Sequence, residues 1–140
     1  MISANPVRFS NPLSRQPLAL KRPYVVSRHG THLTTVLTSL RLEVARTQEQ
    51  PGWVLVLGSP VVLTKQLLEH VGLASHRILV LPAQKLTDMD KTVRDALTCN
   101  TCQAVLTFID DAAQLAEYQY LATKYQTRLV NHCNQFNQPM

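Results

Sequence analysis

The segment from Trp53 to Leu81 constrains the fold most, because two apolar runs flank a helical pattern within it. Residues 54–57 (VLVL) and 78–81 (ILVL) are unbroken runs of β-prone residues, as is typical of strands that are covered on both faces. Between them, apolar residues recur at helical spacing until Gly72, which suits the positive φ that ends many helices. The segment therefore predicts two parallel strands joined by a right-handed helical crossover.

The turn after the first apolar run lies where a nucleotide-binding α/β fold carries its phosphate loop. That loop has the pattern G-x-x-x-x-G-K-[ST], in which backbone amides, a lysine and a hydroxyl hold the phosphates and Mg²⁺. Here Gly58 begins the turn, but Pro60 removes one amide donor and Leu63 stands at the second glycine position. Ser59 suits a helix N-cap, and Pro60 suits the first helical position. We therefore expect a helix to begin at this turn and no nucleotide cofactor to bind there.

Strand and helix patterns alternate along the rest of the chain. Thr87 and Asp90 have the spacing of a capping box at the start of a helix. The remaining predicted elements are a strand over 24–26, a helix over 33–46, a helix from 87 to about 99, a strand over 104–109, a helix from about 111 to 125 and a strand over 128–130. This alternation predicts one three-layer α/β/α domain over residues 24–131, with a mainly parallel sheet of about five strands.

The two ends of the chain differ from this domain. Residues 1–23 contain four prolines and no hydrophobic periodicity, and we expect them to form a disordered basic segment. Seven basic and two acidic residues precede Pro51, a net charge of +5 that equals the formal net charge of the whole chain. Residues 132–140 are expected to form a polar tail. No apolar run approaches the roughly 18 residues of a membrane span, so we expect a cytoplasmic protein without a membrane partner.

Cys99 and Cys102 form a C-x-x-C motif. In redox enzymes the first cysteine of this motif lies at a helix N-terminus, whose dipole lowers its pKa, whereas this pair follows a predicted helix end. A zinc site needs further ligands, and the adjacent His132 and Cys133 point in different directions. We therefore expect reduced turn and strand-edge thiols in a cytoplasmic protein, and no metal.

Other side chains with catalytic potential show no catalytic pattern. Asp110 and Asp111 follow a predicted strand, where α/β enzymes often carry catalytic groups, but they also suit the start of the next helix. The five histidines lack the spacing of metal ligands, and no G-x-S-x-G motif is present. We therefore expect a binding protein rather than an enzyme.

Several short segments follow one another in a fixed order along the chain. They are the strand from Trp53 to Leu57, Leu63 and Leu67 on the helix, Val71-Gly72-Leu73, Arg77 before Ile78, Val93-Arg94-Asp95-Ala96-Leu97 with Asn100, and Phe108-Ile109-Asp110-Asp111. In these segments the chain resembles the SulA-type cell-division inhibitors of Gram-negative bacteria, and the resemblance runs from Tyr24 to about Val130.

The resemblance implies a RecA-like core without a phosphate loop, produced in the SOS response to DNA damage. It also implies a protein that binds FtsZ, blocks its polymerisation and is degraded by the Lon protease. The family's FtsZ-contacting positions correspond to Gly52, Leu57, Leu67 and Arg77, where Gly52 replaces an Arg and Leu67 a Trp. Both leucines also fit core positions, and Trp53 is expected to pack beneath the contact site. The C-terminus lacks the histidine associated with recognition by Lon.

Two other functions are compatible with the sequence. One is a RecA-like accessory protein of DNA repair that binds a recombinase, a polymerase or DNA, with the basic N-terminal segment on the DNA. The other is a degenerate nucleotide-binding enzyme. Nucleic acid is not the expected partner, and a homodimer remains an open alternative.

Overall fold

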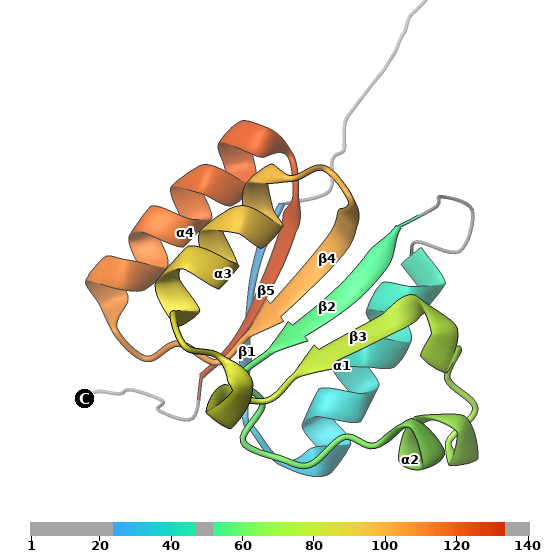
Figure 1. The fold of residues 1–140 in the computed structure, drawn as a ribbon. Helices are drawn as coiled ribbons and strands as arrows, with labels where there is room; N and C mark the ends of the chain where they lie inside the picture. Colours follow the sequence, from blue (N-terminus) through green and yellow to red (C-terminus); the bar gives the residue numbers. More distant parts are fainter. Residues whose placement is uncertain (1–23, 47–51, 134–140) are drawn as a thin grey trace, which may run out of the picture.

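The computed structural model describes residues 24–46 and 52–133. The predicted N-terminal segment 1–23 and most of the predicted tail lie outside these residues. The strands are β1 (Val25–His29), β2 (Trp53–Leu57), β3 (Ile78–Leu81), β4 (Cys102–Thr107) and β5 (Arg128–Cys133). The helices are α1 (Leu33–Arg46), α2 (Lys65–His70), α3 (Met89–Thr98) and α4 (Ala112–Tyr125), with short 3-10 turns η1 (Ser75–Arg77) and η2 (Ala83–Lys85) (Figure 1).

The described strands form one parallel sheet in the order β1-β5-β4-β2-β3. Within the central segment, Val54 lies opposite Ile78 and Leu57 opposite Leu81, as expected for a strand–helix–strand crossover. The predicted parallel sheet of about five strands is therefore confirmed. In the same described residues, no helix is both long and apolar enough to cross a membrane.

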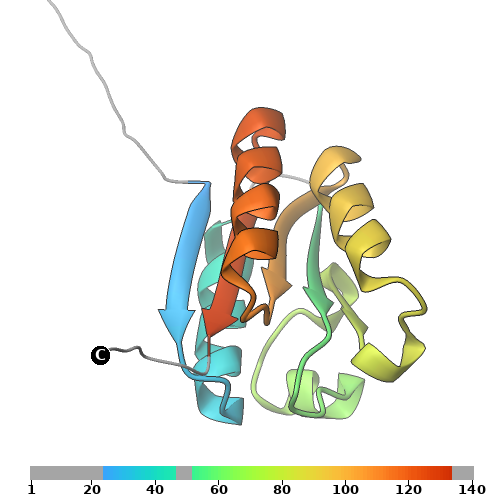
Figure 2. The same ribbon diagram turned by 90° about the vertical axis from the view of Figure 1, so that its left-hand side faces the viewer.

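Helices cover both faces of the sheet and enclose two apolar cores. On one face, Leu40 of α1 and Leu68 of α2 pack against the sheet, and on the other face Leu97 of α3 and Tyr118 of α4 do so. Figure 2 looks onto the face that α3 and α4 cover, with α1 behind the sheet. The predicted three-layer architecture is confirmed. Burial of strand side chains on both faces explains why the β2 and β4 runs contain no polar alternation.

The crossover helix is shorter than the sequence predicts. The prediction that it begins at Ser59 and Pro60 is wrong, because α2 has Thr64 as its N-cap and the Thr64 hydroxyl accepts a hydrogen bond from the Leu67 amide at 3.1 Å. The Ser59 hydroxyl instead donates to the Val61 carbonyl at 2.8 Å and accepts from the Val61 amide at 3.1 Å. These two hydrogen bonds between Ser59 and Val61 compete with helix formation, so an irregular loop precedes α2.

The start of α3 also differs from the prediction. Its N-cap is Asp88, whose carboxylate accepts a hydrogen bond from the Lys91 amide at 3.1 Å, so the predicted capping box of Thr87 and Asp90 is wrong. A carboxylate caps a helix as well as a hydroxyl does, and the two candidates are adjacent in sequence. The Asp90 carboxylate instead accepts hydrogen bonds from Arg94 of α3 and Tyr118 of α4.

Three strands have other ends than predicted, and the first of them, β1, covers Val25–His29 instead of residues 24–26. The polar tail does not begin at residue 132, because β5 continues to Cys133 and His132 is buried, with its Nδ1 atom 3.0 Å from the Gly30 carbonyl oxygen. Pairing with β1 explains the extension, since Arg28 lies opposite His132 in the sheet. The β4 strand begins at Cys102 and ends at Thr107, two residues earlier than predicted at each end.

Candidate partner-binding surface

The carboxyl ends of the strands are the usual ligand site of such a sheet, at the point where the strand order reverses. Here that point lies between β2 and β4, because the chain leaves β2 for β3 on one side and then crosses to β4 on the other. Gly58 follows β2 with φ +74°, and a Cβ atom added there would lie 2.6 Å from the Met89 Cε atom. The Met89 side chain therefore covers the backbone that a phosphate group would have to approach.

The loop between β2 and α2 borders a small cavity of about 280 Å³. Its lining residues are uncharged: Ser59, Pro60, Val61, Val62, Leu63, Val80, Pro82 and Gln84. A phosphate site needs a cation to neutralise the ligand and amide groups to donate to it. The lining of this cavity supplies no cation for a phosphate group.

The two carboxylates after β4 do not form an acid–base pair. Asp111 is the N-cap of α4 and accepts hydrogen bonds from the amides of Ala113 at 2.9 Å and Gln114 at 3.2 Å, which confirms the capping role. Asp110 is exposed, and its carboxylate lies 3.7 Å from the Cys133 sulfur, which donates to it. Capping of α4 therefore explains the position of Asp111, one of the two possible catalytic carboxylates.

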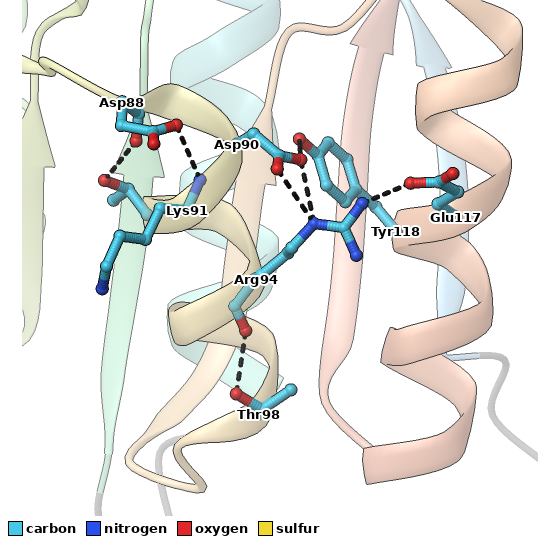
Figure 3. A network of polar contacts seen from close by, with 8 residues as sticks. Asp88, Asp90, Lys91, Arg94, Thr98, Glu117 and Tyr118 are labelled. Carbon is cyan, nitrogen blue, oxygen red and sulfur yellow. Dashed lines mark hydrogen bonds and ion pairs between the residues drawn. The ribbon is translucent and has the colours of Figure 1, made fainter.

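A network of charged side chains joins α3 to α4 (Figure 3). The Arg94 Nε atom donates to both Asp90 oxygens at 3.0 and 3.1 Å, and Arg94 also binds Glu117. The Tyr118 hydroxyl donates to Asp90 at 2.7 Å. The Tyr118 hydroxyl, followed by Arg94, lowers the pKa of Asp90, whereas burial and then the Asp90 carboxylate raise the pKa of Tyr118. These groups hold two helices together, which is a structural role.

The amino ends of β2 and β3 bring two of the predicted contact residues together. Arg77 immediately precedes β3, and Gly52 immediately precedes β2, which runs parallel to β3 with Val54 opposite Ile78. Gly52 has φ +146°, and a Cβ atom added there would lie 2.3 Å from the Gln103 Cγ atom. A larger residue at position 52 would therefore require Gln103 to move, which gives a physical reason for glycine here.

The other two predicted contact residues lie elsewhere. Leu57 is at the carboxyl end of β2, is 1% exposed and belongs to the core beneath α3 and α4. In this conformation a partner cannot touch it. Leu67 is half-buried on α2 and packs against the core on the opposite face of the sheet. The structure thus brings Gly52 and Arg77 together and separates them from Leu57.

An exposed apolar patch adjoins Arg77 at the outer strand of the described sheet. Trp53 is 46% exposed and Leu79 is 45% exposed. Leu79 lies opposite Leu55, and alternation along β2 places Trp53 on the same face of the sheet as Leu55. We call Trp53, Arg77 and Leu79 the β3-edge patch. Sequence reasoning assigned Trp53 to packing and missed Leu79, because an apolar run does not reveal whether its strand is central or at an edge.

No protein-family model matches the chain, and no curated protein matches it. Among solved structures, SulA from Pseudomonas aeruginosa is similar, with a TM-score of 0.65 and 20% sequence identity over 81% of this chain and 100% of that chain. The chain has the SulA fold. The match covers the whole SulA structure, and the SulA likeness expected from the sequence is thereby confirmed for the fold. At this identity, the likeness to SulA concerns the arrangement of the chain and not the role of any residue.

Proposed function

We propose that this protein is a non-catalytic inhibitor of bacterial cell division of the SulA type, produced in the SOS response, which binds FtsZ and blocks its polymerisation. The observation that carries the proposal is the combination of the SulA fold with a switch point at which the end of the Met89 side chain lies against Gly58. A scaffold of nucleotide-binding type that lacks the phosphate-loop residues can still act through its outer surface. No catalytic residue, metal or cofactor forms part of the proposal.

The β3-edge patch is the proposed centre of the contact with FtsZ. Tight protein contacts often combine an aromatic or aliphatic anchor with a flanking arginine, and Trp53, Leu79 and Arg77 offer this combination. Gly52 lies next to Trp53 in the chain and would belong to the rim. An acidic region of FtsZ would complement Arg77 and favour one orientation of the complex.

The two leucines enter the proposal in different ways. Leu67 is partly exposed on α2 and is proposed as a peripheral contact. Leu57 is in the core, so its substitution would act through the packing of β2 rather than through a lost contact. Substituting Leu57 should therefore lower the stability of the protein together with its inhibition of FtsZ.

The proposal places the protein in the cytoplasm, where FtsZ assembles. Degradation by Lon and formation of a homodimer are separate proposals. The half-life of the protein in cells with and without Lon tests the first. Sedimentation equilibrium of the purified chain tests the second.

The direct test is sedimentation of FtsZ polymers in the presence of GTP and increasing amounts of the purified protein. We expect polymer in the pellet to fall in proportion to the added protein, because each bound molecule removes one subunit from assembly. Unchanged polymer at molar excess of the folded protein would refute the proposal.

A matched pair of charge reversals locates the contact. Arg77→Glu should weaken the inhibition by about 10-fold or more, since hot-spot contacts are commonly worth 2 kcal/mol or more. Lys85→Glu is the control, because Lys85 is exposed on η2 at the opposite end of β3. Equal effects of the two variants would show that general charge, rather than the β3-edge patch, determines binding.

A further inference from the structure

The turn between α3 and β4 carries two thiols in different environments. Cys99 follows the last residue of α3 and is exposed, whereas Cys102 is the first residue of β4 and is half-buried against the core. Asn100 between them has φ +66°, so the chain reverses within the turn. Figure 1 shows this turn at the end of the sheet where β2 and β4 begin.

Hydrogen bonds gather around the Cys99 sulfur. The Thr101 Oγ1 atom lies 3.0 Å from it, and the thiol also donates to the Ala96 carbonyl oxygen at 3.6 Å. Burial raises the pKa of Cys99, but the bonds from Thr101 and Cys102 outweigh this and lower it below its ordinary value. The negative end of the α3 dipole, which would oppose a thiolate, is thus offset by donors from the turn.

Cys102 has the opposite character. Burial, followed by the neighbouring Cys99, raises the pKa of Cys102 to about 11. Cys99 and Cys102 flank the two-residue turn in which Asn100 reverses the chain, so the turn brings the two residues back toward one another. An exposed thiol with a lowered pKa beside a half-buried thiol with a raised pKa is the division of roles found in dithiol redox pairs.

We propose that Cys99 and Cys102 form a reversible dithiol–disulfide site that reacts with small-molecule disulfides, with Cys99 as the attacking thiolate and Cys102 as the resolving thiol. A metal site does not account for the pair, because no group of three or more histidine, cysteine or carboxylate side chains in residues 24–46 and 52–133 could hold an ion. This inference does not depend on the proposed binding of FtsZ.

The reaction is a two-step exchange. The Cys99 thiolate attacks one sulfur of the disulfide RSSR, a Cys99–SR bond forms, and the first RS⁻ leaves and takes a proton from water. Cys102 then gives its proton to solvent and attacks the Cys99 sulfur, so that the Cys99–Cys102 bond forms and the second RS⁻ leaves. The protein loses two electrons and two protons, and RSSR becomes two RSH. Excess RSH reverses both steps.

The test uses the full chain in buffers of defined ratios of oxidised to reduced glutathione, followed by acid quenching and peptide mass mapping. We expect one intramolecular Cys99–Cys102 disulfide that reverts on reduction. Cys102→Ser should stop the reaction at a mixed disulfide on Cys99. Cys133→Ser is the matched control and should behave as the unaltered chain, because Cys133 lies at the far end of β5.

A second measurement needs no variant and therefore tests the proposal even if a substituted chain fails to fold. Alkylation of the unaltered chain at neutral pH should modify Cys99 about 100-fold faster than Cys102, because a pKa of about 11 rather than 9 leaves about 100-fold less thiolate. Denaturation should abolish the difference. Failure of the folded chain to form the Cys99–Cys102 disulfide at any glutathione ratio, or equal alkylation rates of the two thiols in the folded chain, would overturn the proposal.

Discussion

At the scale of single residues, one buried carboxylate determines how α1 meets the sheet. Glu43 is 0% exposed, and its Oε1 atom accepts a hydrogen bond from the Arg128 Nε atom of β5 at 2.6 Å. The Arg28 Nη2 atom of β1 lies 3.9 Å from the other carboxylate oxygen. A buried ion pair of this kind adds little net stability over an apolar pair, but the loss of one partner leaves an uncompensated charge.

We therefore predict that Glu43→Gln lowers the free energy of unfolding by about 3 kcal/mol or more. Urea denaturation followed by circular dichroism measures the change. Glu117→Gln is the control, because Glu117 makes its ion pair with Arg94 at the surface and exposed pairs contribute at most about 1 kcal/mol. Equal changes for the two variants would contradict a special role for the buried pair.

A single histidine should make stability depend on pH. Burial, assisted by the charge of Arg28, lowers the pKa of His132 below its ordinary value of 6.5. Near pH 6 the unfolded chain therefore binds more protons at this residue than the folded chain does. The free energy of unfolding should fall as the pH drops below about 6.5 and level off below the pKa of the folded state.

His132→Asn tests this assignment. Asparagine can still donate a hydrogen bond to the Gly30 carbonyl, but it cannot titrate in this range. The slope of unfolding free energy against pH between about 5 and 7 should be smaller in the variant, whatever its absolute stability. An unchanged slope would assign the pH dependence to another group.

At the scale of elements, the helix N-caps give the clearest comparison of neighbouring residues. Asp88 caps α3, whereas the adjacent Thr87 is exposed. We predict that Asp88→Ala lowers the unfolding free energy by about 1 kcal/mol and that Thr87→Ala changes it by less than about 0.5 kcal/mol. Thermal or urea denaturation of both variants decides the matter. If Thr87→Ala lowered the unfolding free energy more than Asp88→Ala did, the capping box expected from the sequence would be correct after all.

The sequence predicts most elements because their patterns are local. Apolar runs and helical periodicity located all five strands and all four helices of the described residues, and Asp111 was correctly expected at the start of α4. The errors concern choices between candidates a few residues apart, such as Ser59 or Thr64 and Thr87 or Asp88, for which each candidate can make a capping bond. The choice of N-cap depends on where the preceding strand ends, and strand ends are set by pairing within the sheet rather than by the local sequence.

The candidate site was harder to predict than the fold. Arg77 and Gly52 were proposed from the resemblance to the SulA family, and the register of β2 and β3 explains why they lie at the same end of the sheet. Leu79 could not, because its exposure depends on β3 being the outer strand of the sheet. The lowering of the Cys99 pKa was also missed, since it arises from hydrogen bonds inside a turn whose shape the motif does not specify.

At the scale of the whole molecule, the two ends of the sheet present different groups. At the carboxyl end of β2 the Met89 side chain lies against Gly58, and the adjoining loop borders an uncharged cavity. The amino ends present the β3-edge patch and the thiol pair, and the Trp53 amide donates to the Thr101 carbonyl of that turn at 3.2 Å. The fold therefore places the proposed contact on the end of the sheet opposite to the usual ligand site.

Trp53 should report the state of the thiols, because it is the single tryptophan of the sequence, its backbone amide is hydrogen-bonded to the turn that joins them, and it lies opposite Cys102 in the sheet. Disulfides quench nearby indole fluorescence. Oxidation of the folded chain should therefore lower its tryptophan emission, and reduction should restore it. The Cys99→Ser variant provides the control and should show no change under the same treatment. An equal change in that variant would point to a cause other than the disulfide.

The most direct measurement of the central claim is the rate of GTP hydrolysis by FtsZ, titrated with two double variants. We predict that Arg77→Glu with Leu79→Asp, at the amino ends of the strands, weakens inhibition by about 10-fold or more. Val62→Asp with Lys85→Glu, at the carboxyl ends, should inhibit as the unaltered protein does, since Val62 is 79% exposed and Lys85 is exposed. Loss of inhibition in the second variant and its retention in the first would contradict the claim.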